Sequence, residues 1–254
     1  MNIKSVSLIK NALALVALVQ IVGFAQTTET KKVSVGDPVV SGSFIRPYKN
    51  LWRLTYTKPT GESMAAATWS DEVEEITVES RRLFKRTQIA KYVNGGYSTL
   101  INVFDPRIFA PVSRDFRRKN GMFNHIDFVP GSISFQRADA PGTDVKQGTV
   151  KLDTAVYDFY GGLYGLLIDG FPLKAGYSAT FPSLDEGTDN IRPATFKVLR
   201  EEMVEAGPGK QVKAWVVVCE DDGMMTFWLT KEAPYIIKLV YVNQQGIKST
   251  YSMM

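Results

Sequence analysis

The stretch YDFYGGLYGLLIDGFPLKAGYSATFPSL, from Tyr157 to Leu184, decides the fold of this chain. Over residues 156–168, apolar side chains recur at spacings of three and four, which places most of them on one face of a short helix. Gly161, Gly162 and Gly165 interrupt this pattern, and each weakens a helix by about 1 kcal/mol relative to alanine. The sequence therefore predicts a short helical segment near residues 156–168, loosened by glycine.

The residues on either side of this stretch have the patterns of β-strands. LWRLTYT at 51–57 alternates between two faces, as a half-buried strand does. Turn signals such as Asn94-Gly95-Gly96 and Asn120-Gly121 recur at intervals of roughly 8–14 residues, which favours antiparallel meanders. A lone apolar helix among such strands must bury its face on the sheet. We therefore predict a mainly β fold with one short helix packed on the sheet.

The first 25 residues have the pattern of an export signal. Lys4 and Lys10 precede an almost uninterrupted apolar run, and small residues before a cut after Ala25 fit a signal peptidase site. An anchoring helix is the alternative, although the apolar run is at the short limit of the roughly 17–25 residues that span a bilayer. We predict a signal peptide at 1–25 and a soluble extracytoplasmic protein, periplasmic or associated with the cell envelope, with no stable transmembrane anchor after cleavage.

Composition limits the remaining possibilities. Without the signal, 28 basic and 26 acidic residues remain, so the charge balance does not support a nucleic-acid partner. Cys219 is the single cysteine and forms no internal disulfide. Residues 26–42 are rich in Thr, Lys and Val without helical periodicity, which predicts a flexible arm. Residues 43–254 are predicted to form a single β domain, because both halves have the patterns of one sheet.

A charged segment follows the first strands. Acidic residues within 71–79 precede basic residues within 81–86, and two interpretations compete: a metal or phosphate site, or the solvated faces of two paired strands. Opposite charges across paired strands are a common stabilising arrangement. The carboxylates also lack the alternating ligand spacing of a calcium loop. We favour the solvated-face interpretation.

No catalytic motif accompanies these patterns. His125 is the single histidine, and Cys219 lies in a valine run typical of a buried, unreactive thiol. One histidine and one cysteine cannot assemble a metal cluster, and no Gly-x-Ser-x-Gly elbow is present. A carboxylate pair that hydrolyses a substrate stays open, since any two strands can bring Asp or Glu together. We predict a non-enzymatic protein without cofactor or metal.

Two short motifs carry a family resemblance. Asp158 followed by Leu163-Tyr164, and then Pro172-Leu173-Lys174-x-Gly176, resembles a family of exported bacterial proteins of unknown function. The run Phe227 to Thr230 is similar to the closing hairpin of that family. The resemblance covers about residues 50–254. The chain departs from the family pattern in the helix motif. Phe159 and Gly161 stand where a Pro and a Ser are common in the family, and an Arg expected after Tyr164 is absent.

This resemblance implies a particular fold and function. The family's fold looks like that of the periplasmic lipoprotein carriers, which implies a strongly curved antiparallel sheet, a half-barrel or open barrel, with the helix on or over its concave face. A concave face with more apolar surface than one helix covers leaves a cleft for a lipid or other apolar ligand. The expected lining consists of Trp52, Tyr56, Phe84, Phe104, Tyr160, Leu163, Tyr164, Leu167 and Phe171. The alternative is a structural or interaction module of the envelope that docks a protein partner.

Overall fold

The computed structural model describes residues 29–185, 190–221 and 223–254. Within these residues, fifteen strands form one sheet in the order β1-β10-β11-β12-β13-β14-β15-β2-β3-β4-β5-β6-β7-β8-β9. The strands are β1 (Lys31–Lys32), β2 (Tyr48–Thr57), β3 (Ser63–Val78), β4 (Arg81–Tyr92), β5 (Tyr97–Asp105), β6 (Ala110–Arg118), β7 (Phe123–Val129), β8 (Ser132–Ala138), β9 (Lys146–Lys151), β10 (Ser178–Leu184), β11 (Ile191–Glu205), β12 (Gln211–Asp221), β13 (Gly223–Leu229), β14 (Ile236–Asn243) and β15 (Lys248–Met253).

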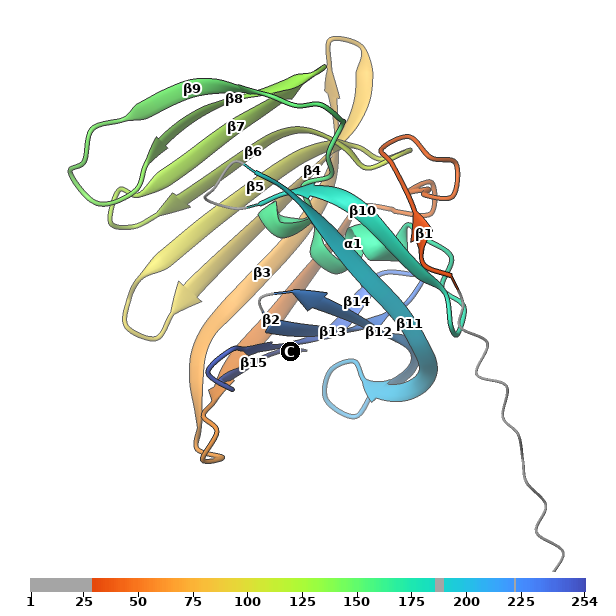
Figure 1. Cartoon of the computed structure of the whole chain (residues 1–254). Helices are drawn as coiled ribbons and strands as arrows, with labels where there is room; N and C mark the ends of the chain where they lie inside the picture. The colour runs from red at the N-terminus through yellow and green to blue at the C-terminus, as the bar shows by residue number, and fades with distance from the viewer. Residues whose placement is uncertain (1–28, 186–189, 222) are drawn as a thin grey trace, which may run out of the picture.

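The sheet consists of two antiparallel meanders joined edge to edge. Strands β2 to β9 follow one another in sequence and in space, as do β10 to β15, and β15 pairs with β2 to join them. Figure 1 shows the sheet curving so that its two halves face each other with α1 (Tyr164–Asp169) between them. The predicted fold class is thereby confirmed: a mainly β protein with a strongly curved, open antiparallel sheet and a short helix on the concave face.

Alternating burial marks the concave face most clearly in β2. In β2, Asn50, Trp52 and Leu54 are buried while the residues between them are exposed. Strand β3 includes the Ala-rich run at 64–67, which has high helix propensity, but its pairing with β2 and β4 holds it extended. Tertiary pairing therefore outweighs local propensity here.

The helical segment differs from its prediction. The sequence predicts a helix near 156–168, whereas the structure has a single wide turn, η1 (Phe159–Leu163), followed by the six-residue helix α1. Gly162 has a φ of 123°, a value that side-chain-bearing residues rarely adopt, and this residue breaks the helical path. Tyr164 follows with a φ of 35°, also in the left-handed region. The glycines thus set a kink rather than soften a continuous helix.

A row of buried polar side chains supports the kinked segment. Arg86 on β4, Asn102 on β5 and Arg114 on β6 are direct cross-strand partners, and each is at most 2% exposed. Arg86 donates hydrogen bonds from Nη1 to the carbonyls of Gly162 and Leu163, at 2.7 and 3.0 Å. Asn102 donates to the carbonyl of Gly161 at 2.8 Å. Carbonyls that the broken helix leaves unpaired are thereby satisfied by the sheet.

Asp158, at the start of the helical segment, binds two side chains of this buried polar row, Asn102 and Arg114. Its Oδ1 accepts a hydrogen bond from Arg114 Nη1 at 2.9 Å, and its Oδ2 accepts one from Asn102 Nδ2 at 2.6 Å. Burial raises the pKa of this carboxyl, while Arg114 and Asn102 act in the opposite direction. Gly161 lies so close that a Cβ there would collide with Arg114 Nη1 and Asp158 Oδ1. Close packing therefore explains Gly161.

The N-terminal arm also differs from its prediction over the residues that the structure describes. The sequence predicts a flexible arm at 26–42, but from residue 29 onward the chain is held against the fold. Strand β1 pairs in parallel with β10, and Val33 and Val40 are only 3% and 2% exposed in the main core. The predicted signal peptide at 1–25 lies outside the described residues. Among the helices of the described ranges, none is both long and apolar enough to cross a membrane.

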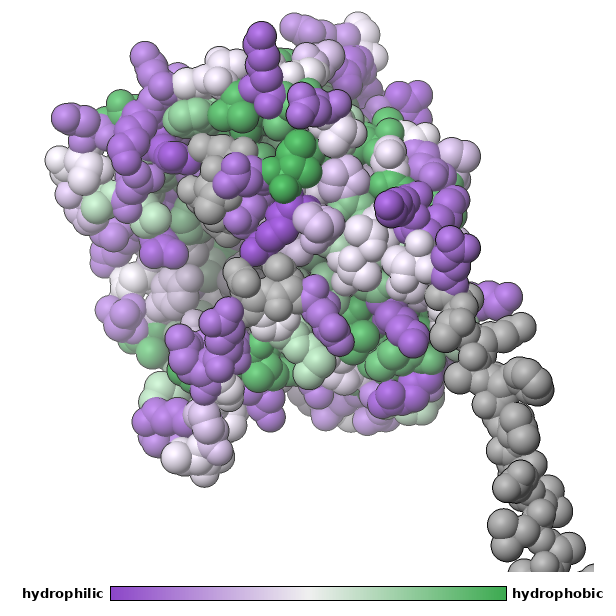
Figure 2. Space-filling model, in the orientation of Figure 1, coloured by the Kyte–Doolittle hydropathy of each residue, from purple (hydrophilic) through white to green (hydrophobic). Residues whose placement is uncertain are grey.

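The main core lies between the two facing halves of the curved sheet. Phe159, Leu163 and Leu167 of the helical segment are fully buried there, beside Phe181 on β10 and Phe227 on β13. Figure 2 shows mostly hydrophilic side chains on the visible face, with separate green groups between them. The apolar face of the helical segment is therefore buried by the sheet, as predicted.

Candidate functional site

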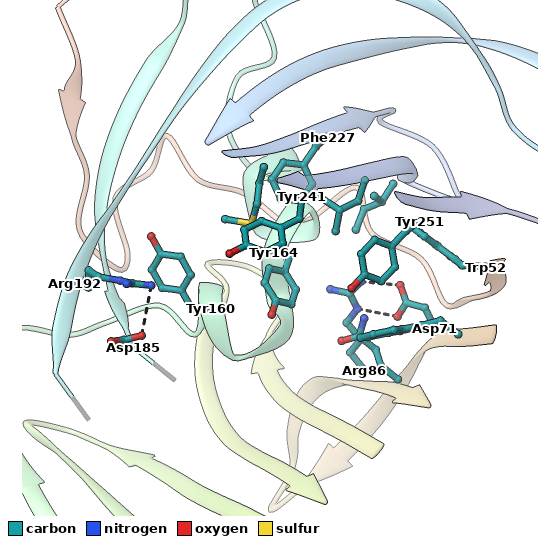
Figure 3. A pocket seen from close by; sticks show the side chains of 15 residues that line it. Trp52, Asp71, Arg86, Tyr160, Tyr164, Asp185, Arg192, Phe227, Tyr241 and Tyr251 are labelled. Atoms are coloured by element: carbon teal, nitrogen blue, oxygen red, sulfur yellow. Dashed lines mark hydrogen bonds and ion pairs between the residues drawn. The ribbon is translucent and has the colours of Figure 1, made fainter. Parts of the chain in front are cut away.

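The main core leaves one side of the helical segment unfilled, and a cavity of about 440 Å³ lies there. This volume falls within the range of small-molecule sites, roughly 300–1,000 Å³. Strands β2, β3, β4, β13, β14 and β15 provide most of its wall, and η1 and α1 provide two tyrosines (Figure 3). It is lined by Trp52, Trp69, Asp71, Arg86, Gln88, Tyr160, Tyr164, Asp185, Arg192, Met225, Phe227, Ile236, Leu239, Tyr241 and Tyr251.

Aromatic side chains form much of this wall. Trp52 and Trp69 are cross-strand partners on β2 and β3. Tyr251 of β15 packs edge-on against both, with ring centroids 6.4 Å from Trp52 and 5.4 Å from Trp69. Burial raises the pKa of the Tyr251 phenol, so this residue stays neutral at physiological pH. The three rings form a rigid, uncharged wall where the two meanders join.

A buried ion pair lies at one end of the cavity. Arg86 donates from Nε to Asp71 Oδ1 at 2.8 Å and from Nη2 to Asp71 Oδ2 at 2.6 Å, and both side chains are 2% exposed. Tyr48 adds a third hydrogen bond to Asp71, at 3.1 Å. Burial acts to lower the pKa of Arg86, but Asp71, Tyr48 and Tyr164 together outweigh burial and the net change is upward. Arg86 therefore stays charged, and its charge is balanced within the protein by the carboxylate of Asp71.

A second ion pair lies at the opposite end of the cavity in the view of Figure 3. Arg192 of β11 and Asp185 approach to 3.4 Å, and both side chains are partly exposed. The Arg192 guanidinium lies 4.3 Å from the centroid of the Tyr160 ring, a cation–π contact. This end is more open to solvent than the end at Arg86, since Arg192 is 28% exposed.

Two polar groups in the wall are buried and unsatisfied. Gln88, the cross-strand partner of Asp71, is 5% exposed, and its Oε1 has no hydrogen-bond partner among the described residues. The same holds for the indole Nε1 of Trp52, which is also 5% exposed. Buried polar groups are nearly always paired, so these two atoms are exceptions among the side chains that line the cavity.

The structure brings together only part of the predicted lining. Trp52, Tyr160 and Tyr164 line the cavity. Tyr56 lies further along β2, is 37% exposed and is not in the wall. The remaining five are fully buried in the main core and pack against other side chains: Phe84, Phe104, Leu163, Leu167 and Phe171.

Sequence reasoning missed the polar part of the site. Asp71 and Arg86 belong to the charged segment assigned to solvated strand faces. That assignment is right for Lys85 with Glu74, which pair across β3 and β4 at 2.7 Å, and wrong for Asp71 and Arg86. The alternation of side chains along a strand could have indicated that these two residues face inward. Asp71 lies on the same face of β3 as Trp69, and Arg86 lies on the same face of β4 as Phe84.

The residues considered for catalysis lie away from the cavity. His125 on β7 lies 3.3 Å from a carboxylate oxygen of each of Asp115 and Asp127, and Cys219 is buried on β12. Neither lines the cavity. Across the described residues, no three His, Cys, Asp or Glu side chains gather in a group that could hold a metal ion.

Residues 52–248 match the family model described as "Protein of unknown function (DUF3108)". The chain belongs to this family. The family of unknown function predicted from Asp158, Tyr164 and the Pro172 motif is thereby confirmed, while export stays a prediction. The matched range of the DUF3108 chain begins at Trp52 in the cavity wall and includes every lining residue except Tyr251.

Two further comparisons accompany the family match. A crystal structure titled a beta-barrel-like protein of domain of unknown function DUF1849 from Brucella abortus covers 82% of this chain and 95% of its own. It has 12% sequence identity and a TM-score of 0.39. No curated protein matches the DUF3108 chain.

Proposed function

We propose that this protein is a non-enzymatic, extracytoplasmic binding protein that holds a lipid or other apolar ligand in the cleft of its half-barrel. The observation that carries the proposal is the aromatic cavity of about 440 Å³ beside the helical segment. A segment that filled the concave face completely would leave no space for a ligand. The extracytoplasmic location rests on the export pattern of residues 1–25.

The chemistry of the wall supports binding rather than catalysis. Tyr251 and Trp52 provide apolar surface, and the carboxylate of Asp71 is bound by Arg86 and Tyr48. A carboxylate held in this way is a poor general base, because its lone pairs are already engaged in hydrogen bonds to Arg86 and Tyr48. Preformed, mostly apolar cavities with a few fixed polar groups are typical of ligand sites.

The test is to fill the cavity from one strand. Met225 of β13 is in the wall and 7% exposed, so Met225→Trp places an indole in the ligand's space. We expect this variant to bind N-phenyl-1-naphthylamine, a neutral fluorescent probe, at least about tenfold more weakly than the wild type. Overpacking costs about 1–3 kcal/mol, so urea unfolding is measured in parallel to show that the variant folds.

Met224→Trp is the matched control. Met224 precedes Met225 on the same strand and is 47% exposed, so an indole there points away from the cavity. Probe affinity should equal that of the wild type. The proposal is overturned if the wild type does not bind the probe, or if both tryptophan variants bind it as tightly as the wild type.

A further inference from the structure

We propose that the tips of the β4–β5 and β6–β7 hairpins form a docking surface for a membrane that contains anionic lipids. The surface consists of residues 91–97 and 118–120, and we call it the basic tip. None of these residues lines the cavity, so the inference goes beyond the proposed function. Two features carry it: cations without a carboxylate partner, and apolar side chains beside them that are exposed to solvent.

Hydrogen bonds join the two hairpins into one surface. The backbone N–H of Lys119 donates to the carbonyl of Tyr97 at 3.0 Å, and its Nζ donates to the carbonyl of Gly95 at 2.9 Å. Both turns lie along the same side of the curved sheet in Figure 1. A shallow groove of about 720 Å³ lies between them. Its lining consists of Tyr92, Asn94, Gly95, Gly96, Tyr97, Arg118, Lys119 and Asn120.

The basic tip carries positive charge that the protein does not neutralise. Lys91, Arg118 and Lys119 are exposed, and among the residues that the structure describes none of the three forms an ion pair. The sequence accounts for this, because residues 80–104 and 116–126 contain no aspartate or glutamate. The three cations are therefore available to an anionic surface.

Neighbouring parts of the sheet show a different arrangement. Lys58 pairs with Glu62 in the β2–β3 turn at 2.8 Å, and Lys85 pairs with Glu74 across β3 and β4 at 2.7 Å. A cation with such a partner gains less from anionic lipids, because the same lipids repel the carboxylate. The basic tip differs in having cations alone.

The exposed apolar side chains favour a lipid surface over an acidic protein. Val93 is 74% exposed, the highest value among the exposed large hydrophobic side chains of the described residues, and Tyr97 is 47% exposed. Apolar side chains flanked by cations are typical of segments that bind the interface of an anionic membrane. Tyrosine suits that interface, since its ring is apolar and its hydroxyl stays in water. Binding to an acidic protein through charge alone would leave Val93 in water.

The basic tip lies close to the cavity wall. Tyr92 of the tip and Tyr251 of the wall pack on the same small cluster, which consists of Leu54, Ala66 and Ala67. A bilayer that binds the tip would therefore lie near the site proposed for an apolar ligand. Only this relation to the cavity depends on the proposed function.

The experiment measures cosedimentation of the wild-type protein with two kinds of vesicle in about 20 mM salt, where surface charges are weakly screened. One kind is phosphatidylcholine alone, and the other is an equal mixture of phosphatidylcholine and phosphatidylglycerol. We expect at least about tenfold tighter binding to the anionic vesicles, and loss of this preference in about 1 M salt. Equal binding to both kinds, or binding to polyglutamate and to neither kind of vesicle, overturns the inference.

Arg118→Gln combined with Lys119→Gln should weaken binding to anionic vesicles about thirtyfold, the equivalent of about 1 kcal/mol for each cation. The control is Lys174→Gln combined with Lys197→Gln, which removes the same charge from exposed positions away from the tip and should change binding little. Urea unfolding of both double variants shows that they fold. An equal loss of binding in both is an effect of net charge alone and overturns the assignment of the basic tip.

Val93→Ser tests the apolar part of the surface. We expect about fivefold weaker binding to anionic vesicles, because less apolar area is buried in the lipid. Unchanged binding overturns the role of Val93.

Met225→Trp separates docking from ligand binding, because it fills the cavity and leaves the tip intact. This variant should bind anionic vesicles as tightly as the wild type. Failure of the wild type to bind N-phenyl-1-naphthylamine contradicts the proposed function, whereas failure to bind anionic vesicles contradicts docking, so the two failures are distinguishable.

Discussion

Arg86 connects the sheet, the helical segment and the cavity. Its guanidinium neutralises Asp71 and donates to the carbonyls of Gly162 and Leu163. Removing one member of a buried pair leaves the other charge without compensation, which costs about 3–5 kcal/mol. We expect Arg86→Met to lower the free energy of unfolding by about that amount in urea titrations.

The double variant and a surface control separate this effect from general damage. Asp71→Leu combined with Arg86→Met removes both charges and should recover part of the lost stability. Arg82 of the same strand pairs with Glu75 at the surface, so Arg82→Met should change stability little. A double variant less stable than Arg86→Met alone would contradict the assignment.

Gly161 is required because of the polar row beneath it. A methyl group there would collide with Arg114 Nη1 and Asp158 Oδ1, both fully buried. We expect Gly161→Ala to destabilise the protein by at least about 2 kcal/mol, because it disrupts a buried ion pair. Gly96→Ala is the control: its new Cβ would meet the end of the exposed Asn94 side chain, which can move. Thermal unfolding of both variants measures the difference.

At the level of elements, α1 is fixed at its C-terminal end as well. Lys231, after β13, donates hydrogen bonds to the carbonyls of Asp169 and Phe171 and lies 3.5 Å from Asp169 Oδ1. The Asp169 side chain is fully buried, and burial raises its pKa from 3.8 to about 8, with Lys231 opposing the shift. The helical segment is thus held by charged groups at both ends.

This carboxyl makes stability depend on pH. Between about pH 4 and pH 8 the folded protein holds the proton of Asp169 and the unfolded chain does not, so this contribution to stability is present at low pH and is lost as pH rises. Asp169→Asn should remove that slope, which is at most about 1.4 kcal/mol per pH unit. Urea unfolding at pH 5 and pH 8 measures it. The control is Asp144→Asn, at an exposed position, and an Asp169→Asn slope equal to that of the control would contradict the account.

Elements with a clear period were predictable from the sequence, and those set by tertiary contacts were not. The strands of the C-terminal meander, such as β12 and β14, follow from apolar runs bounded by turn residues. The kink at Gly162 could not be derived from spacing, because it depends on side chains of Arg86 and Asn102 that reach it across the sheet. Within the arm predicted at 26–42, residues 29–42 were mistaken for a flexible segment, because Val33 and Val40 are buried by the rest of the fold rather than by local neighbours.

The same distinction holds for the candidate site, where only part of the lining was predictable from the sequence. Trp52, Tyr160 and Tyr164 were predicted because aromatic residues on a concave face favour a cleft. Asp71, Arg86 and Gln88 were not predicted, because a charged or amide side chain is usually solvated. Only their position in the alternating pattern of each strand indicated that they face inward. Phe84 and Phe104 were expected in the cleft, but they pack edge to face, 6.1 Å apart, in the core.

At the scale of the molecule, the polar row determines what the curved sheet can hold. It fixes the carbonyls of residues 161–163 on β4 and β5, so the segment fills one side of the concave face. The other side, where β15 joins β2, stays open as the aromatic cavity. We therefore propose that the segment is a fixed wall of the ligand site.

Native mass spectrometry of the protein purified from its own host, without detergent, tests this claim most directly. We expect the wild-type protein to carry one lipid or other apolar ligand per chain, released by solvent extraction, and Met225→Trp to carry none. Wild-type protein that repeatedly shows only the mass of the polypeptide, and that binds no fluorescent probe, would contradict it.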